Sequence, residues 1–178
     1  MGIWPPLETD LERIATLARA RHDDTQAFVY YVDVLWEREG RADGELDAIV
    51  ETIAAEVCAQ IDCTACANCC RHLTVGLTTE DIPPLAQALR LPSHEVISRY
   101  VDRKAGAREG EWGVLCCSPC PFLEGTRCSL YSARPQSCRD YPALTPDFRW
   151  LMPEIVKGVG LCPIIYNVIE RLKVRLAW

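Results

Sequence analysis

The sequence predicts a mainly helical protein: a single domain of about six helices, with a short β-hairpin and irregular cysteine-rich loops around a metal site. Three observations support this class. Apolar residues recur at helical spacing over residues 11–61 and again after Pro163. Cysteines are concentrated between these two regions. A Glu124-Gly125-Thr126 turn there separates two short segments, as expected for a hairpin.

Helical periodicity is clearest in the segment that leads into the cysteines. Asp43 can cap this helix, and a broad apolar stripe follows, formed by Leu46, Ile49, Val50, Ile53, Ala54, Val57 and Ile61. An earlier helix is expected to begin near Thr25 and to end at Gly40. We expect residues 1–62 to form an N-terminal helical extension that packs on the core, its helices lying against the last helix. Residues 63–178 are expected to form a cysteine-cluster metal-binding domain.

Composition limits the classes of function. The formal net charge of −6 argues against nonspecific nucleic-acid binding, which needs a basic surface. No apolar run approaches the roughly 18–20 residues that span a bilayer, so no membrane span is expected. Eleven cysteines could form an exported disulfide framework. The first residues lack the basic and apolar regions of a signal peptide, so we expect thiolate–metal bonds in the cytoplasm instead.

The densest cysteine run reads Cys63-x2-Cys66-x2-Cys69-Cys70. Cysteines three residues apart in a tight segment can direct several thiolates at one point, which is what a metal requires. The adjacent side chains of Cys69 and Cys70 are expected to diverge. On that argument the pair serves two metals, or a cluster and something beside it.

A second group of cysteines begins at Cys116-Cys117-x2-Cys120. The predicted hairpin would hold Cys120 and Cys128 on neighbouring strands. Cys138 follows in an Arg-Pro-x2-Cys-Arg segment, and Cys162 precedes the last helix. Residues from Lys104 to Gly113 are charged and glycine-rich, which predicts a mobile loop.

These motifs together resemble the CxxCxxCC (YkgJ-like) family of zinc- or iron-chelating proteins. The resemblance rests on the first cysteine run, Cys120-Pro121-Phe122-Leu123, Cys128-Ser129-Leu130-Tyr131, Arg134-Pro135-x2-Cys138-Arg139-x-Tyr141-Pro142, the late Cys162 and the threonine-rich helix start at Thr78 to Ile82. It implies eight metal ligands: Cys63, Cys66, Cys69, Cys70, Cys120, Cys128, Cys138 and Cys162. Many members are described as iron–sulfur oxidoreductases.

Spacing alone leaves the metal open. The first run resembles the segment that wraps a [4Fe–4S] cluster in ferredoxins, where a further cysteine precedes proline, as Cys120 and Cys162 do. Eight thiolates would equally make two closed four-cysteine zinc sites. We place an iron–sulfur cluster first, with a redox or related catalytic role. The alternative is a structural zinc module that acts in protein interaction or metal handling.

Several residues beside the predicted ligands have assignable roles. Arg71, Arg134 and Arg139 are expected to offset thiolate charge and to donate hydrogen bonds to sulfur. Cys58, Cys116 and Cys117 fall outside the family pattern and are interpreted first as bystanders. Extra metal ligands and redox-active thiols are the alternatives for the adjacent pair Cys116 and Cys117. His72 is a weaker candidate as a ligand or proton carrier. The sequence identifies no catalytic residue, and it leaves open whether the partner is a protein or a small-molecule substrate.

Overall fold

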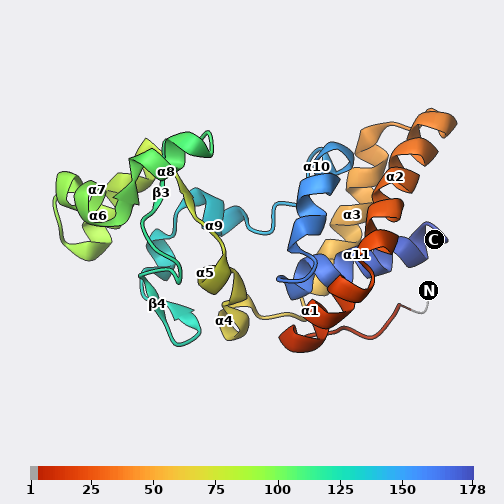
Figure 1. Cartoon of the computed structure of the whole chain (residues 1–178), viewed down its shortest axis with the longest axis horizontal. Helices are drawn as coiled ribbons and strands as arrows, with labels where there is room; N and C mark the ends of the chain where they lie inside the picture. The colour runs from red at the N-terminus through yellow and green to blue at the C-terminus, as the bar shows by residue number, and fades with distance from the viewer. Residues whose placement is uncertain (1–3) are drawn as a thin grey trace. The chain divides into compact units, whose positions relative to one another are not determined.

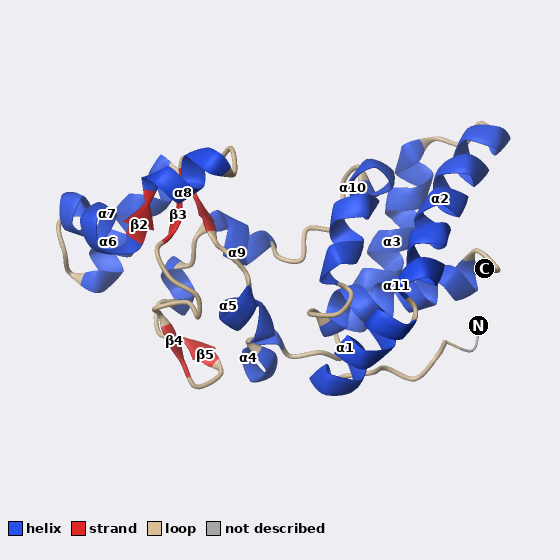
Figure 2. Cartoon of the chain, in the orientation of Figure 1, coloured by secondary structure: helices blue, strands red, loops and turns tan. Residues whose placement is uncertain are grey.

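The structure is a computed structural model that describes residues 4–178. It is mainly helical, with two small antiparallel sheets (Figures 1 and 2), which confirms the predicted fold class. No helix within the described residues is long and apolar enough to cross a membrane.

Contacts divide the chain into two compact units. The helical unit contains the residues up to Asp62 together with Pro142–Trp178, and the cysteine unit is Cys63–Tyr141. The division predicted before Cys63 coincides with a boundary between these units. Residues 142–178, which the sequence-based division placed with the cysteines, are grouped by their contacts with the N-terminal helices.

The helical unit is built around its last helix. Its elements are α1 (Leu11–Ala20), α2 (His22–Glu39), α3 (Asp43–Cys58), α10 (Phe148–Ile155), η3 (Val156–Gly158) and α11 (Pro163–Arg175). Helix α11 packs on α1 and α3, and Lys173 in α11 donates to Asp24 and Thr25 of α2 at 2.8 and 3.3 Å. These contacts place the three early helices against the last one.

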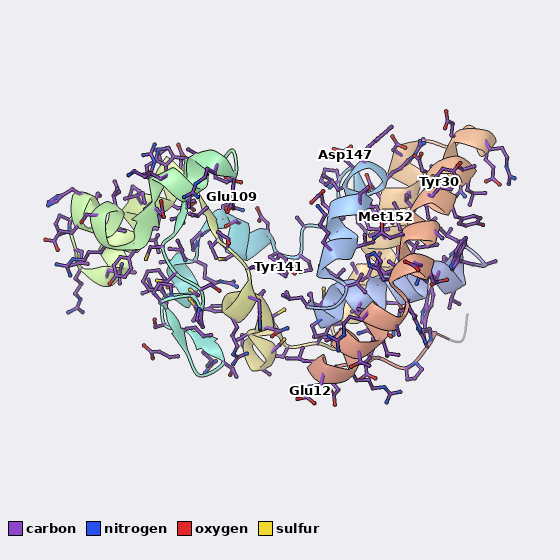
Figure 3. All side chains as sticks on the ribbon, viewed as in Figure 1. Glu12, Tyr30, Glu109, Tyr141, Asp147 and Met152 are labelled. Atoms are coloured by element: carbon purple, nitrogen blue, oxygen red, sulfur yellow. The ribbon has the colours of Figure 1, made fainter. Side chains whose placement is uncertain are left out.

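Helix α10 was not predicted, because its cap comes from another helix. Its N-terminal residue Asp147 makes no side-chain cap of its own. The carboxylate of Asp47 in α3 instead accepts hydrogen bonds from the backbone N–H groups of Asp147 and Phe148, at 3.0 and 2.9 Å. Buried Met152 (labelled in Figure 3) belongs to the apolar face of this helix. A cap supplied across a long sequence separation leaves no local sequence signal.

The cysteine unit combines short helices with short strands. Its elements are α4 (Cys63–Cys66), α5 (Asn68–His72), β1 (Gly76–Leu77), η1 (Thr79–Asp81), α6 (Ile82–Leu89), α7 (Ser93–Tyr100), β2 (Val101–Asp102), α8 (Arg103–Arg108), β3 (Gly113–Leu115), β4 (Leu123–Glu124), β5 (Arg127–Cys128), η2 (Tyr131–Ala133) and α9 (Gln136–Asp140). Strand β3 pairs antiparallel with both β1 and β2. Strands β4 and β5 form the predicted hairpin, with Leu123 opposite Cys128.

The mobile loop predicted from Lys104 to Gly113 is wrong at its start, where α8 forms. Asp102 caps this helix by accepting from the backbone N–H groups of Lys104 and Ala105, at 2.9 and 2.8 Å. Helix α8 also packs on β3. The cap and the packing outweigh the poor helix propensity of Gly106.

An apolar cluster holds the cysteine unit together. Its buried members are Leu77, Ile82, Leu85, Ala86, Val96, Leu115 and Phe122. The partly buried Cys120 and Cys128 pack against this cluster. The hairpin cysteines are therefore set against the apolar core of this unit.

Gly106 tests how closely α8 and β3 approach. A Cβ atom at Gly106 would lie 2.5 Å from the Cα of Gly113, so we expect Gly106→Ala to lower the free energy of unfolding by about 1–3 kcal/mol. Gly44→Ala is the matched control, because a Cβ there meets nothing within 4 Å and α3 gains a better helix former. Denaturant titrations would measure both, and equal effects of the two substitutions would contradict this packing.

Candidate metal centre

The first cysteine run is helical rather than an irregular loop. It forms α4 and α5, joined by Ala67, which adopts a left-handed conformation with φ of 51°. The backbone N–H of Ala67 donates to the Cys63 carbonyl at 3.1 Å. A helical turn places residues three apart on one face, so α4 still brings Cys63 and Cys66 to the same side.

The sulfur atoms of Cys69 and Cys70 do not diverge as predicted. Their Sγ atoms are 3.9 Å apart. The prediction considered Cα–Cβ directions alone, whereas rotation about χ1 brings the two sulfurs back together. With zinc–sulfur bonds of about 2.3 Å, two ligands of a tetrahedral ion lie roughly 3.8 Å apart. The adjacent pair therefore does not by itself require two metals.

The hairpin brings two further thiols to Cys70. The backbone N–H of Cys120 donates to the Cys70 carbonyl at 2.8 Å, which joins the first cysteine run directly to the start of the hairpin. The N–H of Leu123 donates to the Cys120 carbonyl at 3.1 Å, and Leu123 pairs with Cys128. Helix α4 also contacts β5.

Cys138 completes a group of four neighbouring thiols with Cys70, Cys120 and Cys128, which we call the four-thiol group. Burial first, and then negative charge on any of the other three thiols, raises the pKa of the Cys138 thiol to about 12. Burial likewise raises the pKa values of Cys120 and Cys128, and both also respond to charge on Cys70. Charge on Cys117, outside the predicted ligand set, also raises the pKa of Cys120, with a smaller effect than charge on Cys128 or Cys70. Such mutual coupling requires the sulfurs to be near one another in a poorly solvated site.

Two backbone N–H groups point toward sulfurs of the four-thiol group. Hydrogen bonding from Phe122 lowers the pKa of Cys120, and hydrogen bonding from Leu130 lowers the pKa of Cys128, each partly offsetting the effect of burial. In both cases the donor lies two residues after the cysteine. These donors stabilise the thiolate form, which is the form that binds metal.

The sulfur atoms of the four-thiol group are neighbours, but they do not lie at the mutual distances of ligands that share one metal ion. Across residues 4–178, no three Cys, His, Asp or Glu side chains lie close enough together to hold a metal ion. The donor chemistry nevertheless fits a soft metal or an iron–sulfur cluster, because the group consists of sulfur alone. Contraction around a bound metal is expected, since such sites rarely have their final geometry without it.

A comparison with family models identifies the chain's relatives. Residues 62–155 match the model of the CxxCxxCC family, whose description reads "Putative zinc- or iron-chelating domain". The chain belongs to the CxxCxxCC family. The match contains every predicted ligand except Cys162, and it supports cysteine-ligated metal binding. No curated protein and no solved structure matches the chain.

The remaining predicted ligands of this CxxCxxCC chain lie in different places. Cys63, Cys66 and Cys69 lie on α4 and α5, beside the four-thiol group in sequence and within the same unit. Cys162 is buried at the N-cap of α11, in the helical unit. Whether these four join the ligand set stays a prediction.

The predicted arginines differ in what they contact. Arg71 donates to the carbonyls of Cys66 and Gly125, at 2.8 and 3.0 Å, and so ties α4 to the hairpin turn. The positive charge of Arg134 lowers the pKa values of Cys128 and Cys138. Arg139 donates to the Arg134 carbonyl and to Gln136. Arg134 is thus the arginine whose charge reaches the four-thiol group, while hydrogen bonds from these arginines to sulfur stay a prediction.

Sequence reasoning did not identify the role of Asp81. Its side chain is only 5% exposed, and one carboxylate oxygen accepts from the N–H and hydroxyl of Thr78, at 2.9 and 3.1 Å. The other oxygen accepts from the backbone N–H of Gln136 at 2.9 Å. Next to it, the Ser137 hydroxyl donates to the Gly76 carbonyl at 2.7 Å. These bonds fix the start of α9, and with it Cys138.

Asp81→Ala should therefore loosen the segment that carries Cys138. Losing these bonds leaves buried donors unsatisfied, and we expect the free energy of unfolding to fall by about 1–3 kcal/mol. Metal retention against a chelator should weaken in parallel. Glu80→Ala, an exposed neighbour, is the control and should change neither property. Unchanged melting and metal retention in Asp81→Ala would contradict the anchoring role.

The raised thiol pKa values predict how the stability of the metal-free protein depends on pH. Folded Cys138 keeps its proton up to about pH 12, whereas the unfolded thiol loses it near 9.0. This contribution is complete below pH 9.0 and is lost as pH rises through that window, because the unfolded state then binds fewer protons. Cys120 and Cys128 act in the same direction.

Denaturation of chelator-treated protein between about pH 8 and 11 measures this effect. Stability should fall with pH, and Cys138→Ala should show a shallower fall than the unchanged chain. Identical pH profiles for the two proteins would refute the assignment to Cys138.

Proposed function

We propose that the chain is an iron–sulfur protein in which the four-thiol group holds the cluster, a [4Fe–4S] cluster in the first instance. The observation that carries this proposal is the convergence of four sulfurs from three separate segments of the cysteine unit, namely Cys70 in α5, Cys120 and Cys128 at the hairpin, and Cys138 in α9. A packed core has no need for such an arrangement, and membership of a family described as zinc- or iron-chelating supports metal binding by these cysteines.

The spacing of the thiols before metal binding is compatible with a cluster, which is larger than one ion. A single tetrahedral ion needs all its sulfurs within a few ångströms of one another, and no three side chains in the described part of the chain meet that spacing. A polynuclear cluster is larger, so its ligands stand further apart around it. The cysteines of α4 and α5 extend the available set of ligands.

A bound cluster would supply one-electron transfer in a redox or related catalytic role. The chain's own residues would control the access of water to the cluster and the charge around it. Phe122 is buried and packs its ring against Tyr100, with centroids 5.0 Å apart, which keeps water from the apolar side of Cys120. The charge of Arg134 and the N–H donors of Phe122 and Leu130 favour the more negative state of the site.

Zinc is the second candidate, and the Cys69–Cys70 pair favours it. Its sulfur separation of 3.9 Å is close to one edge of a tetrahedral zinc–thiolate site. The chain would then be a structural module for protein interaction or metal handling. Either metal fits a reducing compartment such as the cytoplasm, where thiols persist. A protein partner or a small-molecule substrate is compatible with either role.

Anaerobic purification with elemental analysis separates the two candidates. Iron and acid-labile sulfide, with visible absorption that dithionite bleaches, are expected for the iron–sulfur protein. A colourless protein that contains zinc and does not respond to dithionite would establish the alternative. A preparation that retains neither metal after reconstitution would refute both.

Ligand variants test the same site. Cys138→Ser and Cys69→Ser should release metal and destabilise the cysteine unit, because the free energy of metal binding adds to that of folding. Cys58→Ser is the matched control, since Cys58 is exposed in α3 and lies outside the cysteine unit. Metal loss from Cys58→Ser, or full metal content in Cys138→Ser, would show that the ligand set is wrong.

A further inference from the structure

A second pair of adjacent cysteines lies just beyond β3. Cys116 and Cys117 are both exposed, and their Sγ atoms are 3.1 Å apart. The backbone there is held in place, since the N–H of Cys116 donates to the Tyr100 carbonyl at 3.0 Å. Leu115, the residue before the pair, is registered opposite Val101 in the sheet. The two thiols are thus presented together at the end of an ordered strand.

The geometry of this pair does not suit a tetrahedral ion. With metal–sulfur bonds of about 2.3 Å, sulfurs at this distance subtend roughly 85° at the metal, well below the tetrahedral angle of about 109°. No third metal ligand is grouped with them among residues 4–178. The pair is also outside the family pattern that supplies the proposed ligands. A different chemistry is therefore needed to account for it.

A small, solvent-connected cavity is lined by both cysteines. Its volume is about 190 Å³, and its lining includes Cys116, Cys117, Ser118, Asp102 and Glu109, the last of which is labelled in Figure 3. That is room for several water molecules or one small solute. Small polar reagents can thus reach the two thiols from a polar, solvent-connected side.

We propose that Cys116 and Cys117 are an oxidisable dithiol, separate from the metal ligands, that closes to a disulfide when it reacts with a hydroperoxide. The sulfur of Cys117 first takes one oxygen from the hydroperoxide, forming a sulfenic acid and releasing an alcohol, or water when the oxidant is hydrogen peroxide. The sulfur of Cys116 then displaces the hydroxyl group as water. Two thiols and one hydroperoxide thus give one disulfide, one alcohol and one water.

The contacts of the two sulfurs suggest this order of events. The S–H of Cys116 donates to the Arg99 carbonyl at 3.4 Å, which holds its proton in place. Cys117 is therefore the thiol oxidised first, and Cys116 resolves the sulfenic acid. Adjacency makes the second step intramolecular, so it outcompetes further oxidation.

Peptide mapping of the full chain with its metal tests this site. The protein would be treated with limiting hydrogen peroxide, quenched in acid, denatured and alkylated. Fragmentation should show that Cys120 is alkylated whereas Cys116 and Cys117 are not, with their peptide lighter by two hydrogen atoms. A thiol reductant should reverse the change. Phenylarsine oxide, which captures closely spaced dithiols, should bind before oxidation and not after it.

Variants and metal analysis distinguish the possible outcomes. Cys116→Ser should trap Cys117 as a sulfenic acid that dimedone labels, and Cys117→Ser should greatly reduce the response to peroxide. Cys58→Ser, which removes another exposed cysteine, should behave like the unchanged chain. Alkylation of both Cys116 and Cys117 after peroxide, or a disulfide that maps to other cysteines, would overturn the proposal. Metal content is measured on the same samples, so failure of the metal proposal is seen separately.

Discussion

The arrangement of the cysteine unit depends on one buried carboxylate. Asp81 stands between the start of α6 and the start of α9, and its two oxygens accept hydrogen bonds from both sides. A buried carboxylate whose partners were removed would be costly, so these segments are constrained to remain together. Cys138 lies two residues beyond the Gln136 N–H that Asp81 holds. The hydrogen bonds of one carboxylate thereby help to position the segment that carries Cys138.

Arg71 has the corresponding role on the other side of the site. Its guanidinium donates to the carbonyls of Cys66 and Gly125, and the Arg71 backbone carbonyl accepts from the Ser118 hydroxyl at 3.0 Å. The first cysteine run, the hairpin turn and the segment before Cys120 are therefore joined through one residue. Segments this short cannot bury enough apolar surface to be ordered by packing, so backbone carbonyls and a few polar side chains supply the order.

What the sequence predicted depended on the range of the interactions involved. Helix α3 and the β4–β5 hairpin rest on periodicity and turn residues that lie within a few positions, and both were predicted. Helix α10 rests on Asp47, which lies 100 residues from the Asp147 N–H that it accepts from. The role of Asp81 rests on Gln136, which lies 55 residues away. The cysteine spacing indicated metal chemistry. It did not indicate which thiols converge, because that depends on contacts between distant segments.

The two adjacent cysteine pairs show how backbone context separates identical sequence features. Cys69 and Cys70 lie in the helix α5 with sulfurs 3.9 Å apart, whereas Cys116 and Cys117 follow a strand with sulfurs 3.1 Å apart. The wider separation suits two ligands of one metal, and the narrower one suits a bond between the sulfurs themselves. Had spacing in the sequence been decisive, both pairs would have been assigned the same chemistry. The local fold instead supports metal binding at one pair and thiol oxidation at the other.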